Sequence, residues 1–212
     1  MAKVKLAKKS TRIDMTAMCD VAFLLLSFFI MTSTAKVPEP KPVDTPASTV
    51  KAKLPEKNLA TITIGDSTIY FGVSERELRV AMLDKMAEKY SMTFTEDEKY
   101  KFSLIDGFGV DMAELKGLIK LKSAERNVEG LQKGIPYRDS TNNQLEDWVK
   151  AARESAFELS QAKGESPPNE LKVAIKGDSK EKFPTVKIVL DLLQKQEVNK
   201  FYLVTGLRSE DF

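Results

Sequence analysis

The sequence predicts a single N-terminal transmembrane α-helix followed by an extracytoplasmic α+β domain that carries a helical insertion. Three observations support this fold class. Residues 15–35 form an apolar stretch with one ionisable side chain, Asp20. Five of the nine prolines lie in residues 36–58, and strand-like and helix-like patterns alternate from residue 59 onward.

The composition excludes several classes of function. The 212 residues contain 33 Lys and Arg against 31 Asp and Glu, and five of the bases lie in residues 1–14. Because the rest of the chain is nearly neutral, it lacks the basic excess that is typical of nucleic-acid binders. The chain has no histidine and a single cysteine, Cys19, which excludes His-based catalytic triads, an intrachain disulfide and a cysteine-rich zinc site. We therefore expect no enzymatic activity, no metal and no cofactor.

Residues 15–35 are long enough to span a membrane. As a helix, these 21 residues rise roughly 30 Å, which is the thickness of the hydrocarbon core. Five bases precede the stretch and Lys36 alone follows it, so the positive-inside rule predicts a cytoplasmic arm at residues 1–14. A cleaved signal peptide is the alternative, since Ser33-Thr34-Ala35 suits a cleavage site. The length of the stretch and the acid near its beginning favour a retained helix.

Asp20 is the residue on which function is predicted to depend. An aspartate within a membrane helix costs about 2.5–3.5 kcal/mol on insertion scales, so such residues are kept mainly where they have a role. On a helical wheel, Thr16, Ser27 and Thr34 fall within roughly 40° of Asp20 and form one polar stripe. Such a stripe faces a partner helix or a water-filled path, where a carboxyl group can exchange protons. Two simpler interpretations remain: Asp20 only holds a partner helix, or it is hydrated near the cytoplasmic face.

Residues 36–58 are predicted to be a Pro-rich periplasmic linker. This composition cannot bury a core and favours extended conformations. An inert spacer is the simpler interpretation. A switch segment that pairs with itself or with a partner is the alternative.

Residues 59–212 predict a compact domain with the order ββαβαβ. The first two strands form a hairpin around Gly65-Asp66, and Ser74 with Glu77 suits a capping box that begins a helix. The predicted elements are strands at 59–64 and 68–71, a helix to about residue 90, a strand at 170–176, a helix at 184–196 and a strand at 201–205.

Residues 91–168 are predicted to be a helical insertion in this domain, with helices at 111–132 and 142–163. The acidic run Glu96-Asp97-Glu98 is interpreted as solvated surface. Trp148 is expected to be a packed core aromatic rather than a partner anchor. Gly107-x-Gly109 lacks the lysine and the third glycine of a phosphate-binding loop.

The membrane segment resembles the signature of the ExbD/TolR family. The resemblance is carried by Ile13-Asp14-Met15-Thr16-Ala17-Met18-Cys19-Asp20-Val21 and by the apolar residues 24–26 and 28–31. In that family a short basic arm leads into one helix, with Thr four residues before a membrane Asp and Val directly after it. The sequence departs from the pattern at Asp14, where the family usually has Asn, and at Ala17, where it usually has Pro. The strong part of the resemblance covers residues 12–36.

The resemblance implies that Asp20 is the family's membrane aspartate and Thr16 its threonine. It implies a homodimer whose two helices lie inside a pentameric ring of an ExbB/TolQ-like multi-span protein. It also implies that proton passage is coupled to a TonB- or TolA-like transducer. The expected location is the bacterial inner membrane, with the C-terminal domain in the periplasm.

The function expected on this basis is that of a proton-channel subunit in a motor, driven by proton-motive force, that energises TonB-dependent outer-membrane transport. The alternatives are a TolR-like role in envelope integrity or motility, and a membrane-anchored scaffold in which Asp20 only holds a partner helix.

Overall fold

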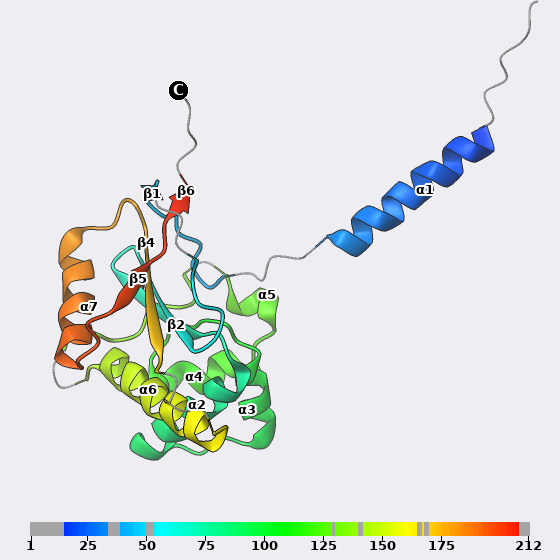
Figure 1. The fold of residues 1–212 in the computed structure, drawn as a ribbon. Helices are drawn as coiled ribbons and strands as arrows, with labels where there is room; N and C mark the ends of the chain where they lie inside the picture. The colour runs from blue at the N-terminus through cyan, green and yellow to red at the C-terminus, as the bar shows by residue number, and fades with distance from the viewer. Residues whose placement is uncertain are drawn as a thin grey trace, which may run out of the picture. The chain divides into compact units, whose positions relative to one another are not determined.

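The computed structural model describes residues 15–33, 39–49, 53–128, 130–139, 142–164, 167 and 170–207 (Figure 1). The chain consists of an N-terminal unit and a globular domain, which are described separately. The N-terminal unit contains helix α1, Met15–Thr32. Its last turn closes where the N–H of Ser33 donates to the carbonyl of Phe29 at 2.9 Å. The 18 residues rise about 27 Å, close to the thickness of a hydrocarbon core.

A four-stranded sheet lies at the centre of the globular domain. Its strands, in spatial order, are β3 (Thr68–Val73), β2 (Leu59–Gly65), β4 (Lys172–Gly177) and β5 (Phe201–Leu203). The β2–β3 pair is antiparallel, whereas β2–β4 and β4–β5 are parallel. The order of these strands and of the helices α2 and α7 confirms the predicted ββαβαβ arrangement.

The β2–β3 hairpin turns at Asp66 and Ser67, which have φ values of 51° and 57°. Two consecutive left-handed residues fit a type I′ turn, whose twist matches that of the two strands. The turn lies one residue later than Gly65-Asp66, because Gly65 still pairs with Thr68 in the ladder.

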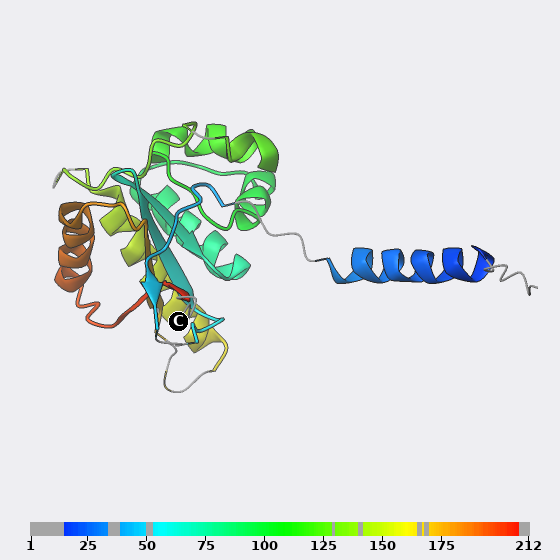
Figure 2. The same cartoon turned by 90° about the horizontal axis from the view of Figure 1, so that it is seen from above.

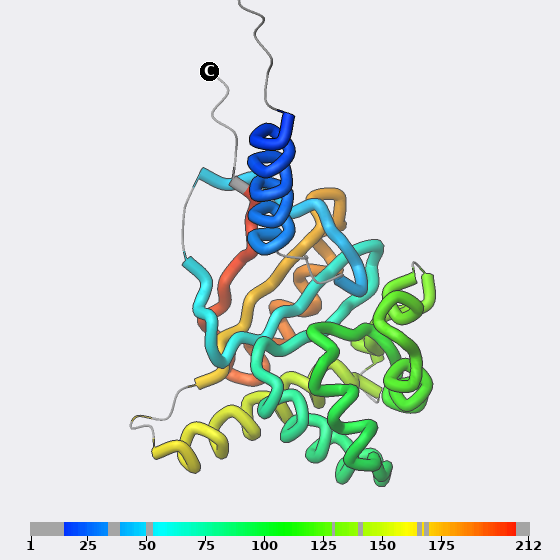
Figure 3. Tube along the Cα trace, turned by 90° about the vertical axis from the view of Figure 1, so that its right-hand side faces the viewer, coloured from blue at the N-terminus to red at the C-terminus, as the bar shows by residue number. Residues whose placement is uncertain are grey.

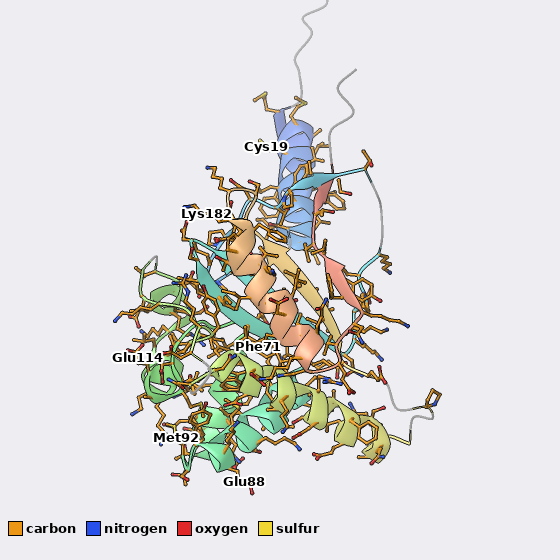
Figure 4. The ribbon with its side chains drawn as sticks, turned by 90° about the vertical axis from the view of Figure 1, so that its left-hand side faces the viewer. Cys19, Phe71, Glu88, Met92, Glu114 and Lys182 are labelled. Carbon is orange, nitrogen blue, oxygen red and sulfur yellow. The ribbon has the colours of Figure 1, made fainter. Side chains whose placement is uncertain are left out.

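Three helices cover one face of the sheet: α2 (Arg76–Lys89), α6 (Gln144–Ala162) and α7 (Phe183–Lys195). Alternate residues of β2, including Ile62 and Ile64, are fully buried in a core shared with these helices. Phe71 of β3 belongs to the same core and lies in the interior of the domain in Figure 4. The alternation of buried and partly exposed residues is that of a sheet with one face in the core.

The capping box predicted for α2 does not form. The N-cap residue is Glu75, and its side chain does not cap the helix. The Glu75 carboxylate instead accepts from the N–H of Asn58 at 3.1 Å, and the Ser74 hydroxyl accepts from the N–H of Leu59 at 3.4 Å. Both polar groups therefore hold the beginning of β2.

The insertion contains α3 (Glu96–Ser103), α4 (Met112–Lys120), α5 (Ser123–Arg126) and α6. The acidic run expected as plain surface is the first turn of α3, where Thr95 and Glu98 form a capping box. The helix predicted at 111–132 is divided, because Leu121 adopts an extended backbone. Helices α3–α5 and α7 lie on opposite sides of the domain (Figure 2).

The insertion also closes the outer edge of β3. Phe71 and Phe108 exchange backbone hydrogen bonds of 2.8 and 2.9 Å, and the N–H of Ile135 donates to the carbonyl of Ile69 at 2.8 Å. An edge strand covered in this way cannot pair with another chain. Trp148 is fully buried against the rings of Phe102 and Phe108, as predicted.

Part of the Pro-rich stretch lies on the globular domain. Strand β1 (Ala47–Ser48) pairs in parallel with β6 (Gly206–Leu207), close to the end of the described chain (Figure 3). The N–H of Ser179 donates to the carbonyl of Asp44 at 2.7 Å. Residues 39–49 are thus held on the domain by main-chain bonds.

Candidate functional site

Helix α1 exposes its apolar side chains. None of its side chains is buried, and Phe23, Leu24 and Ile30 are 72%, 64% and 67% exposed. An apolar helix with no core of its own to pack against is stable where lipid or partner helices surround it. Among the described residues, α1 is the one helix that is long and apolar enough to cross a membrane.

Asp20 is the single charged residue of α1. It lies five residues after Met15, or roughly 7–8 Å along the helix axis. Its side chain is exposed, and no ion pair or hydrogen bond joins it to any residue that the structure describes. A membrane carboxylate without a partner among the described residues finds one outside them, for example in another chain or in water.

Ser27, which belongs to the predicted polar stripe, differs from Asp20. Ser27 is partly buried, whereas the other residues of α1 are exposed. Its hydroxyl donates to the carbonyl of Leu24 at 2.8 Å. Ser27 is thus satisfied within its own helix and requires no partner. Thr16 lies one turn before Asp20 on the same side of α1, and Thr34 lies outside the described residues.

Thr32, which the sequence analysis left out of the stripe, has a hydroxyl that donates to the carbonyl of Phe28 at 2.8 Å. Cys19 is exposed directly beside Asp20 (Figure 4). Cys19 offers a single attachment point for a probe next to the carboxylate, since the chain contains no other cysteine.

The described part of the globular domain shows no group of three or more metal-ligating side chains. What the sequence analysis missed there is the attachment of residues 39–49. Lys41 Nζ lies 2.6 Å from the Asp66 carboxylate, and Lys176 Nζ lies 2.5 Å from the Glu39 carboxylate. No local pattern predicts these contacts, because Asp66 and Lys176 lie far along the chain from residues 39–49.

A comparison with protein families gives a match to the family described as biopolymer transport protein ExbD/TolR, over residues 7–207. No curated protein and no solved structure matched the chain. The matched region covers nearly the whole sequence, including α1, the sheet and the helical insertion. A membrane-length helix with one carboxylate, followed by an α+β domain, is the architecture that the resemblance predicted. The chain therefore belongs to the ExbD/TolR family of biopolymer transport proteins.

Proposed function

We propose that this chain is the proton-conducting subunit of an inner-membrane motor of the ExbB–ExbD type, which energises TonB-dependent outer-membrane transport. Asp20 takes up a proton from one side of the membrane and releases it to the other. The observation that carries the proposal is the single carboxylate of α1, which has no partner among the described residues. Its partners are an ExbB/TolQ-like ring, a second copy of this chain and a TonB-like transducer.

The energetics of this role are sufficient. Moving one elementary charge through 100 mV is worth about 2.3 kcal/mol. That amount changes a two-state equilibrium by a factor of roughly 50. Protonation of Asp20 also removes the charge that opposes lipid contact, so each proton alters how α1 packs against its surroundings.

The proposal includes a topology. Residues 1–14 lie in the cytoplasm, α1 spans the inner membrane, and the globular domain lies in the periplasm, where it meets the transducer. The basic residues before α1 support this orientation. A reporter that is fluorescent only in the cytoplasm, fused after the last residue, is expected to stay dark.

The test of the proton pathway is Asp20→Asn, which keeps the size and hydrogen bonding of the side chain but cannot carry a charge. The variant is expected to co-purify with its ring partner. Proteoliposomes that contain the variant complex are expected to show no acidification. Ser27→Ala is the matched control, because the Ser27 hydroxyl is satisfied within α1 and its loss is expected to leave proton flux unchanged.

Other results would change the assignment. Full proton flux in Asp20→Asn would show that protons do not pass through Asp20. Failure of the variant to assemble with its ring partner would instead show that Asp20 serves to hold a partner helix. A TonB-dependent role predicts loss of energised outer-membrane uptake in cells that carry the variant. Leakage of periplasmic proteins with normal uptake would favour the TolR-like alternative.

A further inference from the structure

A groove of about 1010 Å³ lies on the globular domain beside β4 and β5, whereas the sheet edge that the insertion closes is that of β3. One wall is a face of α6, and the other is formed by the beginning of β4 and the turn between α7 and β5. Leu171 and Val198, which are 9% and 8% exposed, line it as an apolar floor. Phe157, 46% exposed, and the half-buried Tyr202 add two aromatic rings.

The two walls are fixed to each other. Arg153 Nη1 donates to the backbone carbonyl of Gln196 at 2.5 Å, and Gln196 Nε2 donates to the backbone carbonyl of Glu146 at 2.8 Å. These bonds connect the insertion helix α6 to the α7–β5 turn. A groove held open in this way loses little conformational entropy when a ligand binds.

Some charged side chains that line the groove form ion pairs, and others do not. Glu146 lies 3.2 Å from Lys195, and Glu154 lies 3.6 Å from Lys85, so these two lining carboxylates already have cations. Three lining lysines have no carboxylate within ion-pair distance among the described residues: Lys150, Lys172 and Lys200. Two lining carboxylates, Glu170 and Glu197, form no ion pair with a described residue.

We propose that this groove binds an extended, acidic polypeptide segment of a partner protein. The three lysines and Arg153 fit carboxylate side chains, and the apolar floor with its two rings fits an aromatic or aliphatic anchor. Glu170 and Glu197 can accept hydrogen bonds from main-chain amides, which a peptide offers and an inorganic anion lacks. The binding surface is thus shared between α6 of the insertion and the β4–β5 side of the sheet. The proposal does not depend on the role of Asp20.

The experiment uses the full chain in lipid nanodiscs and a displayed library of random twelve-residue peptides as the probe. Peptides recovered on the wild-type chain are expected to be enriched in Asp and Glu next to an aromatic or aliphatic residue. One recovered peptide, labelled with a fluorophore, is then measured by anisotropy. Its Kd is expected to rise at least about ten-fold in Lys150→Glu/Lys200→Glu and on raising the salt concentration.

The matched control is Lys133→Glu/Lys187→Glu, which makes the same change in charge at exposed positions outside the groove. The control is expected to retain wild-type affinity. Phe157→Ser tests the apolar contribution and is also expected to weaken binding. Recovery of peptides without acidic enrichment, or equal loss of affinity in the groove and control variants, would overturn the proposal. Because no membrane potential is applied, these results do not depend on whether Asp20 conducts protons.

Discussion

Lys176 on β4 forms an ion pair with Glu39, with Nζ 2.5 Å from Oε2, although 137 positions separate the two residues. The Lys176 side chain is 17% exposed and the Glu39 side chain is 36% exposed, so the ion pair is partly shielded from water. The pair fixes Glu39, at the beginning of the docked stretch, to β4, one of the two inner strands of the sheet. Residues 39–49 are therefore a docked segment with defined contacts, whereas the composition alone indicated an extended linker.

Removal of the lysine should loosen this segment. In Lys176→Ala, residues 39–49 lose a partly buried ion pair worth about 0.5–1 kcal/mol, while the β1–β6 pairing remains. Hydrogen exchange of this segment is expected to become faster, with the α2 and α6 amides unchanged. Lys187→Ala, on the exposed side of α7, is the control. Unchanged exchange in Lys176→Ala would mean that the main-chain bonds alone hold the segment.

A second contact of this segment should respond to pH. A hydrogen bond from Lys41, together with its charge, holds the pKa of Asp66 below its ordinary value of 3.8. Because the pKa is lower in the docked form, the contact is present above about pH 4 and is lost as the pH falls through the folded pKa. Carbon NMR of the Asp66 carboxyl is expected to give a midpoint below 3.8, and Lys41→Gln is expected to raise this midpoint towards the ordinary value. The same midpoint in both proteins would refute the contact.

The sheet was predictable because its signals are local. Residues 59–64 alternate in the way that a half-buried strand requires, and α7 begins with Pro184 in its first turn and keeps its apolar residues on one face. Membership in the ExbD/TolR family was likewise indicated by a short motif around Asp20. The site prediction rests on a rare residue in a long apolar stretch, and this feature needs no knowledge of tertiary contacts.

Two of the failures have a common cause in long-range contacts. Ser74 has the spacing of a capping box, but its hydroxyl accepts from Leu59, fifteen positions away. The docking of residues 39–49 depends on β6 and Lys176, which no local pattern reveals. Helix α3 was missed because an acidic run suits both a solvated loop and a helical first turn, where negative charge is favourable.

A buried arginine should dominate the stability of the globular domain. The side chain of Arg79 is 5% exposed, and its guanidinium donates to the carbonyls of Val73 at 2.6 Å and Ser103 at 2.8 Å. It also pairs with Asp106 at 2.5 Å. Arg79→Met leaves these buried acceptors without a donor and is expected to lower the free energy of unfolding by about 3–5 kcal/mol. Denaturant titration followed by the fluorescence of Trp148, the only tryptophan, measures the change.

Asp106→Asn separates the two parts of this arrangement. Asp106 is 53% exposed, so loss of its charge is expected to lower the free energy of unfolding by less than about 1 kcal/mol, since the carbonyl contacts of Arg79 remain. If Asp106→Asn were as destabilising as Arg79→Met, the ion pair and not the carbonyl contacts would account for the role of Arg79.

Replacement of Ser155 on α6 should stabilise the domain. Ser155 is fully buried, and its hydroxyl has no hydrogen-bond partner among the described residues. Ser155→Ala removes a desolvated polar group and raises helix propensity, so the free energy of unfolding is expected to increase by about 0.5–1.5 kcal/mol. Ser160, also on α6 and 3% exposed, does have an interaction partner, and Ser160→Ala is therefore expected to be destabilising. If both substitutions lowered the denaturant midpoint reported by Trp148, a buried water at Ser155 would be the explanation, and the unpaired hydroxyl would be rejected.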